Sequence, residues 1–152
     1  MPSQTAGYLI DPTTGTLSIA AIHDPADRLG HDTGHQMQFI LSAKTFDVLP
    51  FEIDGVRYLA WHDALCFEGY ATGLITIDKS PFIAGRCMIF ADDGKTPEDA
   101  DATPFGLTPQ IAITDLAKRV TCYRPVIIPR LTNGAPTGFD LALERSRLTV
   151  VS

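Results

Sequence analysis

An Asp-Gly pair at positions 54 and 55 stands between two apolar runs, and it restricts the fold of this chain more than any other local feature. Gly adopts the positive φ that a two-residue turn requires, so the pair is typical of a tight turn between antiparallel strands. The runs on either side, residues 46–53 and 56–61, are rich in residues that favour strands. The sequence therefore predicts a β-hairpin in the middle of the chain and an antiparallel sheet around it.

Other segments repeat this strand-like pattern. Turn residues between Asp11 and Gly15 separate two short apolar runs, which predicts a second hairpin near the N-terminus. The segment Cys87–Phe90 is apolar throughout and is expected to be a central strand. Strands are also expected at residues 74–77 and 121–128, with Pro129 ending the latter, and turns at Asn133–Gly134 and Thr137–Gly138.

Three segments are helical or ambiguous. Met37–Ala43 fits a helix capped by Asp32 or Thr33, and it also fits a strand. Residues 108–120 predict a strand end followed by a helix with cations near its C-terminal end. The tail from Phe139 fits a final hairpin with residues 148–150, and a helix over Asp140–Arg147 is the alternative.

The length of the chain limits the number of domains. A chain of 152 residues fits one domain, or one domain with an extension. We predict an α+β fold in which a small, mainly antiparallel sheet carries one or two helices packed on one face. Residues 1–123 would form the compact domain. Residues 124–152 would form a C-terminal strand or hairpin extension packed on the same domain.

Several features favour a cytoplasmic protein that does not bind membranes. The N-terminus lacks the basic start and apolar run of a signal peptide, and no window is apolar enough for a membrane span. The cysteines (Cys66, Cys87 and Cys122) form an odd, widely spaced set, which fits a reducing compartment better than a disulfide framework.

Charge is distributed unevenly along the chain. Residues 118–152 carry six basic and two acidic side chains, a sum of +4, whereas residues 1–117 carry six basic and sixteen acidic ones, a sum of −10. An acidic surface keeps a protein soluble and also favours basic partners. The polar segment 92–104 is expected to be an exposed loop. The candidate protein-binding residues are Asp92, Asp93, Glu98, Asp99 and Asp101, with Trp61 as an interface anchor if it is exposed.

Several motifs, in the same order along the chain, resemble an uncharacterised family of small proteins from phages, plasmids and other mobile elements, domain-of-unknown-function family 3846. The matching positions are the Y-L-I-D-P run Tyr8–Pro12, then Thr45, Phe46 and Val48, the acidic turn Leu59–Leu65, the segment Pro81–Asp92, and Pro109, Ile111, Leu116 and Val120. The chain departs from the family pattern at Ile83, where Leu is usual, and at Trp61–His62, where acidic residues are usual.

The resemblance spans residues 7–123 and implies a small cytosolic α+β accessory protein. It implies no activity, because the family has none to carry over. The final thirty residues have no counterpart in it.

Two groups of residues suggest chemistry. His31 and His35 are four residues apart, with carboxylates nearby, so on a helix they would chelate a metal; turn hydrogen bonds in a polar loop are the more frequent role. His62 and Cys66 are also four residues apart and would suit an activated thiolate, although a free Cys is more often a small buried apolar residue. No motif for a cofactor is present, so none is predicted.

The C-terminal arginines are the best candidates for nucleic-acid contacts. Arg124 follows Tyr123, which would stack on a base, and further cations stand along the tail. Surface ion pairs are the commoner role for such residues in an acidic chain. The full set is Tyr123, Arg124, Arg130, Arg145 and Arg147.

The sequence favours a non-enzymatic binding or regulatory accessory protein of a phage or mobile element. Its expected partner is a host protein, and inhibition of a defence or nucleic-acid-handling protein is the role we consider first. One alternative is a small metal-dependent or hydrolytic enzyme using the region of His31, His35 and His62. The other is a nucleic-acid-binding accessory factor using the C-terminal arginines.

Overall fold

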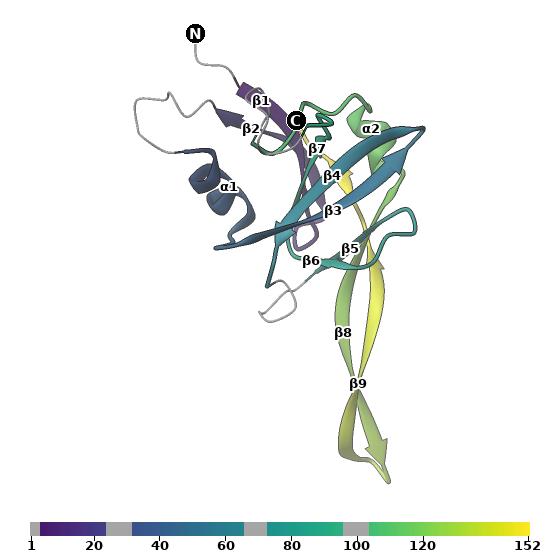
Figure 1. Ribbon diagram of the computed structural model, residues 1–152. Helices are drawn as coiled ribbons and strands as arrows, with labels where there is room; N and C mark the ends of the chain where they lie inside the picture. The colour runs from purple at the N-terminus through teal and green to yellow at the C-terminus, as the bar shows by residue number, and fades with distance from the viewer. Residues whose placement is uncertain (1–3, 24–31, 66–72, 96–103) are drawn as a thin grey trace.

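The chain folds into two packed β-sheets, and one long hairpin projects away from them (Figure 1). The computed structural model describes residues 4–23, 32–65, 73–95 and 104–152. The strand order is β10-β2-β1-β7-β4-β3 in the larger sheet and β6-β5-β8-β9 in the smaller one. The elements are β1 (Gln4–Asp11), β2 (Thr16–His23), α1 (Thr33–Leu41), β3 (Phe46–Ile53), β4 (Val56–Asp63), β5 (Leu74–Ile77), β6 (Ile83–Ala84), β7 (Cys87–Ala91), α2 (Ile113–Ala117), β8 (Val120–Thr132), β9 (Ala135–Ser146) and β10 (Thr149–Val150).

The two predicted hairpins of the larger sheet are confirmed. Strands β1 and β2 pair antiparallel from Gln4↔His23 to Asp11↔Thr16, and β3 and β4 pair from Phe46↔Asp63 to Ile53↔Val56. The second turn contains Asp54 at φ 52° and Gly55 at φ 79°. Both central residues therefore have the positive φ of a type I′ turn, whose twist matches that of the flanking strands.

Strand β7 joins these hairpins into one sheet. It pairs antiparallel with β1 on one side and β4 on the other, and all five of its residues are buried. Successive side chains of a strand point to opposite faces, so Cys87, Ile89 and Ala91 lie on one face while Met88 and Phe90 lie on the other. The prediction of a central apolar strand is confirmed.

Each face of the larger sheet has its own hydrophobic core. The first core lies between the two sheets and includes Ile89 from the larger sheet, Ile75 from the smaller one and Leu116 from α2. The second core lies on the opposite face, where Met37 of α1 packs with Phe90. The two helices thus contact opposite faces of the larger sheet, so the expectation of one or two helices packed on one face is not confirmed. One face of the larger sheet is covered by α1, and the opposite face is covered mainly by the smaller sheet.

Capping settles the choice between helix and strand for the segment after residue 32. The Asp32 carboxylate accepts a hydrogen bond from the His35 backbone N–H at 2.7 Å, as an N-cap residue does. This hydrogen bond is the main cause that lowers the pKa of Asp32. At the other end Ser42 adopts φ 52° and its N–H returns to the carbonyls of Gln38 and Phe39. Asp32 is therefore the cap, and the segment is helix α1.

The C-terminal third of the chain differs most from expectation. Strand β8 continues through Pro129 to Thr132, Thr137 and Gly138 lie inside β9, and the Asp140–Arg147 segment is strand rather than helix. The predicted turn at Asn133–Gly134 is confirmed, with φ 52° and 81°. Helix α2 is shorter than expected, because it comprises only Ile113–Ala117.

Strand β9 pairs with β8, whereas the predicted hairpin paired the tail with itself. The last strand, β10, instead crosses to the larger sheet and pairs parallel with β2. The Thr149 N–H donates to Gly15 O at 2.7 Å, and the Val151 N–H donates to Leu17 O at 2.9 Å. Gly15 has φ +67°, and a Cβ at this position would overlap the Arg147 carbonyl oxygen. The crossing of the C-terminal segment therefore requires glycine at position 15.

We expect Gly15→Ala to destabilise the protein more than Gly55→Ala does. Both sites have positive φ, which costs a residue with a Cβ about 1–2 kcal/mol. A Cβ at Gly55 meets nothing within 4 Å, whereas at Gly15 it also collides with the backbone. Urea unfolding of both variants measures the difference. Equal losses would show that β10 does not depend on this close approach.

Two phenylalanines test the placement of the core. Phe90 is 1% exposed and Phe139 is 68% exposed. We expect Phe90→Ala to lower the free energy of unfolding by about 3–5 kcal/mol, because it opens a cavity. Phe139→Ala should cost less than about 1 kcal/mol, because its side chain is already in water. Chemical denaturation at low protein concentration checks both values, and a similar cost at the two sites would contradict the described core.

Candidate interaction site

The projecting hairpin is formed by residues 124–132 of β8 and 135–144 of β9, and we call it the arm (Figure 1). Strand β5 pairs with β8 only as far as Tyr123, because β5 has four residues and β8 has thirteen. Beyond Tyr123, β9 is the only strand beside β8 among the described residues. The length difference between neighbouring strands therefore creates the arm.

The arm is a regular ladder. Strands β8 and β9 pair from Cys122↔Ser146 to Thr132↔Ala135, with one register shift between Arg130 and Leu131. The Asn133–Gly134 turn closes the ladder, and the β-branched residues Val126, Ile127 and Ile128 favour extended backbone. Local sequence chemistry therefore favours the hairpin conformation of the arm.

The two faces of the arm differ in chemistry. Residues opposite each other in a ladder share a face, so Ile127 lies with Leu141, whereas Arg124 lies with Glu144 on the other side. The apolar face consists of Pro125, Ile127, Pro129, Phe139, Leu141 and Leu143. The charged face carries two cross-strand ion pairs, Arg124–Glu144 at 3.4 Å and Arg130–Asp140 at 3.1 Å.

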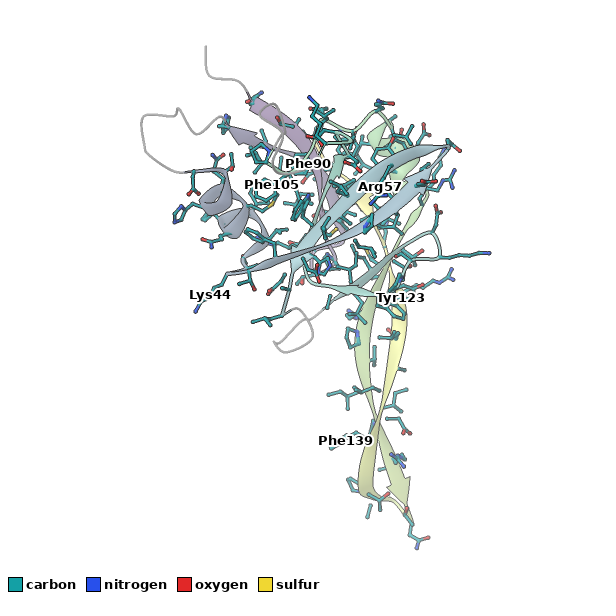
Figure 2. The ribbon with its side chains drawn as sticks, in the orientation of Figure 1. Lys44, Arg57, Phe90, Phe105, Tyr123 and Phe139 are labelled. Carbon is teal, nitrogen blue, oxygen red and sulfur yellow. The ribbon has the colours of Figure 1, made fainter. Side chains whose placement is uncertain are left out.

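The apolar face is open to solvent. The side chains of Ile127, Phe139 and Leu141 are 63%, 68% and 77% exposed. Figure 2 shows Phe139 on the arm, far from Phe90 and Phe105 in the body. Covering one such side chain is worth about 1.5–3 kcal/mol, and contiguous exposed apolar patches mark interaction sites. A two-stranded ribbon is also at best marginally stable in water by itself. The arm thus presents a surface that another apolar surface would stabilise.

The apolar face continues onto the body at the base of the arm. Cys122 is buried in the core between the sheets, so its neighbour Tyr123 points to the outer side of the smaller sheet, as Pro125 and Ile127 do. The Tyr123 ring meets Phe82 edge to face, with centroids 5.4 Å apart. Tyr123, predicted as a base-stacking residue, therefore already has an aromatic partner.

The predicted arginines do not form one basic patch. Arg124 and Arg130 lie on the charged face of the arm, each beside a carboxylate of the opposite strand. Arg145 lies opposite Tyr123 at the base, and Arg147 follows the end of β9; both are exposed. Two of the four cations are thus neutralised within the chain, which reduces the positive charge that is available to bind phosphate groups.

The acidic candidates are only partly described. Asp92 Oδ2 lies 3.0 Å from Arg57 Nε, and the Asp92 side chain is 22% exposed. The expectation of a freely exposed Asp92 was therefore wrong. The Asp93 carboxylate accepts a hydrogen bond from the Lys95 N–H at 3.0 Å. Glu98, Asp99 and Asp101 lie outside the described residues. Asp92 and Asp93 therefore serve local structure, and their role in binding stays a prediction.

Trp61 belongs to the second core. Its Nε1–H donates to Phe105 O at 2.9 Å, and the two rings meet edge to face with centroids 5.0 Å apart. The side chain is half-buried and packs against the cluster around Met88 and Phe90. This packing makes Trp61 an anchor for the 104–107 segment within its own chain.

The histidine and cysteine candidates are divided between described and undescribed parts. His31 and Cys66 lie outside the described residues. His35 Nδ1 lies 2.9 Å from Asp32 Oδ1, and His62 Nδ1 lies 3.0 Å from Asp63 O. Within residues 4–23, 32–65, 73–95 and 104–152, no group of three or more side chains is arranged to hold a metal. The metal and thiolate hypotheses stay predictions.

Two thiols can be assigned from their surroundings. Cys87 and Cys122 are free and buried in the core between the sheets. Burial raises the pKa of the Cys87 thiol far above its usual range. Burial, with a smaller effect of Asp11, raises the pKa of Cys122 to about 11. Both thiols therefore stay protonated at neutral pH and do not act as nucleophiles.

Sequence reasoning missed the apolar face of the arm. The signal was present in an almost continuous apolar run, 125–131, and an alternating run, 139–143, on either side of Asn133–Gly134. Because the first strand was predicted to end at Pro129, the two runs were not recognised as the paired strands of one hairpin.

Neither a scan against protein-family models nor searches of curated proteins and of solved structures finds a match to this chain. Among the described helices, none has the length and apolar character needed to cross a membrane.

We expect Cys87 and Cys122 to resist alkylation by iodoacetamide at pH 8 in the folded protein and to react fully in denaturant. The reason is that the thiolate is the reactive species and burial disfavours it. Mass spectrometry of labelled peptides distinguishes the cysteines. Labelling of Cys122 in the folded protein at the rate of a free thiol would contradict its burial.

Proposed function

We propose that this protein is a binding protein that engages another protein through the apolar face of the arm. The observation that carries the proposal is the exposure of Ile127, Phe139 and Leu141 together on one side of a hairpin that projects from the body. A projecting hairpin reaches a groove or a concave surface that the body itself cannot enter.

The energetics of the face support binding rather than solvation alone. Burying apolar surface contributes about 25 cal/mol per Å², and large side chains at the centre of an interface contribute most. Two prolines and the β-branched Ile127 lie on this face and have few side-chain rotamers, so their burial costs little side-chain entropy. The charged face, with its carboxylates and arginines already paired, keeps the opposite side of the arm hydrated.

We infer a regulatory role directed at a host protein, in line with the accessory character that the family resemblance implies. The acidic residues of 1–117 favour a partner whose apolar site has a basic rim, because complementary charge speeds association and disfavours wrong partners. Inhibition of a defence or nucleic-acid-handling host protein is the specific form of this role that we propose.

The alternative functions have less support. Nucleic-acid binding through Arg124 and Arg130 would have to break their ion pairs with Glu144 and Asp140. The enzyme hypothesis depends on His31 together with His35 and His62, and His31 lies outside the described residues.

Two neighbouring isoleucines provide the test. Ile127 lies on the apolar face and Ile128, which is 47% exposed, lies on the charged face opposite Asp140. We expect Ile127→Ser to weaken binding to a protein captured from host lysate at least tenfold. Burial of such a side chain is worth about 1.5–3 kcal/mol, and each loss of about 1.4 kcal/mol weakens binding tenfold. Ile128→Ser removes the same atoms and should bind like the wild type. Calorimetry with the purified partner measures both.

A partner that binds both variants equally well would place the interface away from the apolar face and contradict the proposal. Recovery of nucleic acid instead of protein, lost on neutralising Arg145 and Arg147, would favour the nucleic-acid alternative.

A further inference from the structure

The two outer edges of the arm differ in what they offer to another strand. The Arg119 carbonyl accepts a hydrogen bond from Asp78 N–H at 2.8 Å on the β5 side. Because backbone groups alternate sides along an antiparallel strand, the odd-numbered residues of β8 point their N–H and C=O groups to this outer side. Pro125 and Pro129 are both in this set and have no N–H. Between them only Ile127 offers a donor, so the β8 edge is protected against strand addition.

The β9 edge has no proline at its outward positions from 139 to 143, although the Phe139 carbonyl already accepts a hydrogen bond from Arg130 Nη2 at 3.3 Å. Even-numbered residues of β8 face β9, and Arg124 lies opposite Glu144, so the even-numbered residues of β9 point inward. The backbone groups of Phe139, Leu141 and Leu143 therefore point outward, and none of these residues is proline. Strand β9 is the last strand of its sheet among the described residues. It presents the outward N–H groups of Phe139, Leu141 and Leu143 and the outward carbonyls of Leu141 and Leu143 to another strand, and the Phe139 carbonyl keeps one lone pair for a second donor.

We propose that the β9 edge pairs antiparallel with β9 of a second copy of this chain, around a two-fold axis at Leu141. An identical antiparallel strand supplies an acceptor for each outward donor and a donor for each outward acceptor, which makes the edge self-complementary. This surface is distinct from the apolar face, so the inference does not depend on the proposed function.

Charge favours the second copy as the occupant. The carboxylates of β9 in this region, Asp140 and Glu144, lie 3.1 and 3.4 Å from the guanidinium groups of Arg130 and Arg124 in their own chain. Two arms can therefore approach without net repulsion, although the rest of the chain is strongly acidic.

Charge also selects the register. With the axis at Leu141, Phe139 lies opposite Leu143 of the partner subunit and Asp140 lies opposite Ala142 of the partner subunit. Moving the axis to Ala142 would set Asp140 against Glu144 of the partner subunit, and like charges directly opposite each other destabilise a sheet. Only the first of these registers avoids this opposition.

The pairing has a structural benefit for both arms. Two marginal ribbons become one four-stranded sheet with an apolar face, and sheets of three or more strands with such a face can be stable independently. A two-fold axis perpendicular to this sheet keeps both apolar faces on the same side. Side chains of Phe139, Leu141 and Leu143 from the two chains then form one continuous apolar surface about twice as wide as that of a single arm.

Two proline substitutions test the edge. Leu141→Pro removes an outward N–H from the β9 edge, and Ile127→Pro removes the matching outward N–H from the β8 edge, directly across the ladder. Neither loses a hydrogen bond within the arm. By sedimentation velocity we expect a dimer for the wild type and for Ile127→Pro, and at least a tenfold weaker dimer for Leu141→Pro. A monomeric wild type at about 100 μM, or an unchanged dimer for Leu141→Pro, would overturn the inference.

Crosslinking tests the register independently of folding effects. In an antiparallel hydrogen-bonded pair the Cα atoms lie about 5.5 Å apart, within disulfide range. In a Cys66→Ser background, Leu141→Cys should form a disulfide-linked dimer under mild oxidation, whereas Ile127→Cys should not. Equal crosslinking of both variants would indicate face-to-face contact and overturn the edge model. Ile127→Ser separates the two proposals, because it should weaken partner binding and leave the dimer intact.

Discussion

Burial of β7 on both faces is the constraint on which the rest of the structure depends. Its residues alternate between two cores, so Ile89 packs toward the second sheet while Phe90 packs toward α1. A strand with apolar side chains on both faces needs cover on both, and the chain supplies a helix for one face and a sheet for the other. The pairing register of the hairpins on either side of β7 is then fixed. A shift of the register by one residue would move every side chain to the opposite face of the sheet and into the wrong core.

The arm follows from a mismatch within the covering sheet. The four residues of β5 suffice to seal the core, so β8 need only be four residues long at this place. The remainder of β8 does not contact the core, so core packing does not restrict its sequence. Alternating apolar residues persist there nonetheless, on the side away from the ion pairs of the charged face. This exposed apolar face is the observation from which the binding role is proposed.

Elements set by local chemistry could be predicted from the sequence. The turns at Asp54–Gly55 and Asn133–Gly134 need positive φ, the Asp32 cap needs only its own helix, and the run Cys87–Phe90 is apolar throughout. Elements set by distant pairing could not be predicted. Pro129 can remain within β8 because the side on which it lacks an N–H has no neighbouring strand among the described residues. That side is unpaired because β5 pairs with β8 only as far as Tyr123. The parallel pairing of β10 with β2 likewise joins residues more than a hundred positions apart.

The return of the chain through β10 gives the arm a mechanical character. One leg of the hairpin begins in the smaller sheet, where Val120–Tyr123 pair with β5, and the other leg leads to Thr149, which is tied to Gly15 in the larger sheet. Both legs of the arm pair with each other in the smaller sheet down to Ser146, and the segment after the second leg is held in the larger sheet. The base of the arm is therefore attached to both layers that enclose the first core, so the position of the arm is fixed by the same packing that holds the two sheets together.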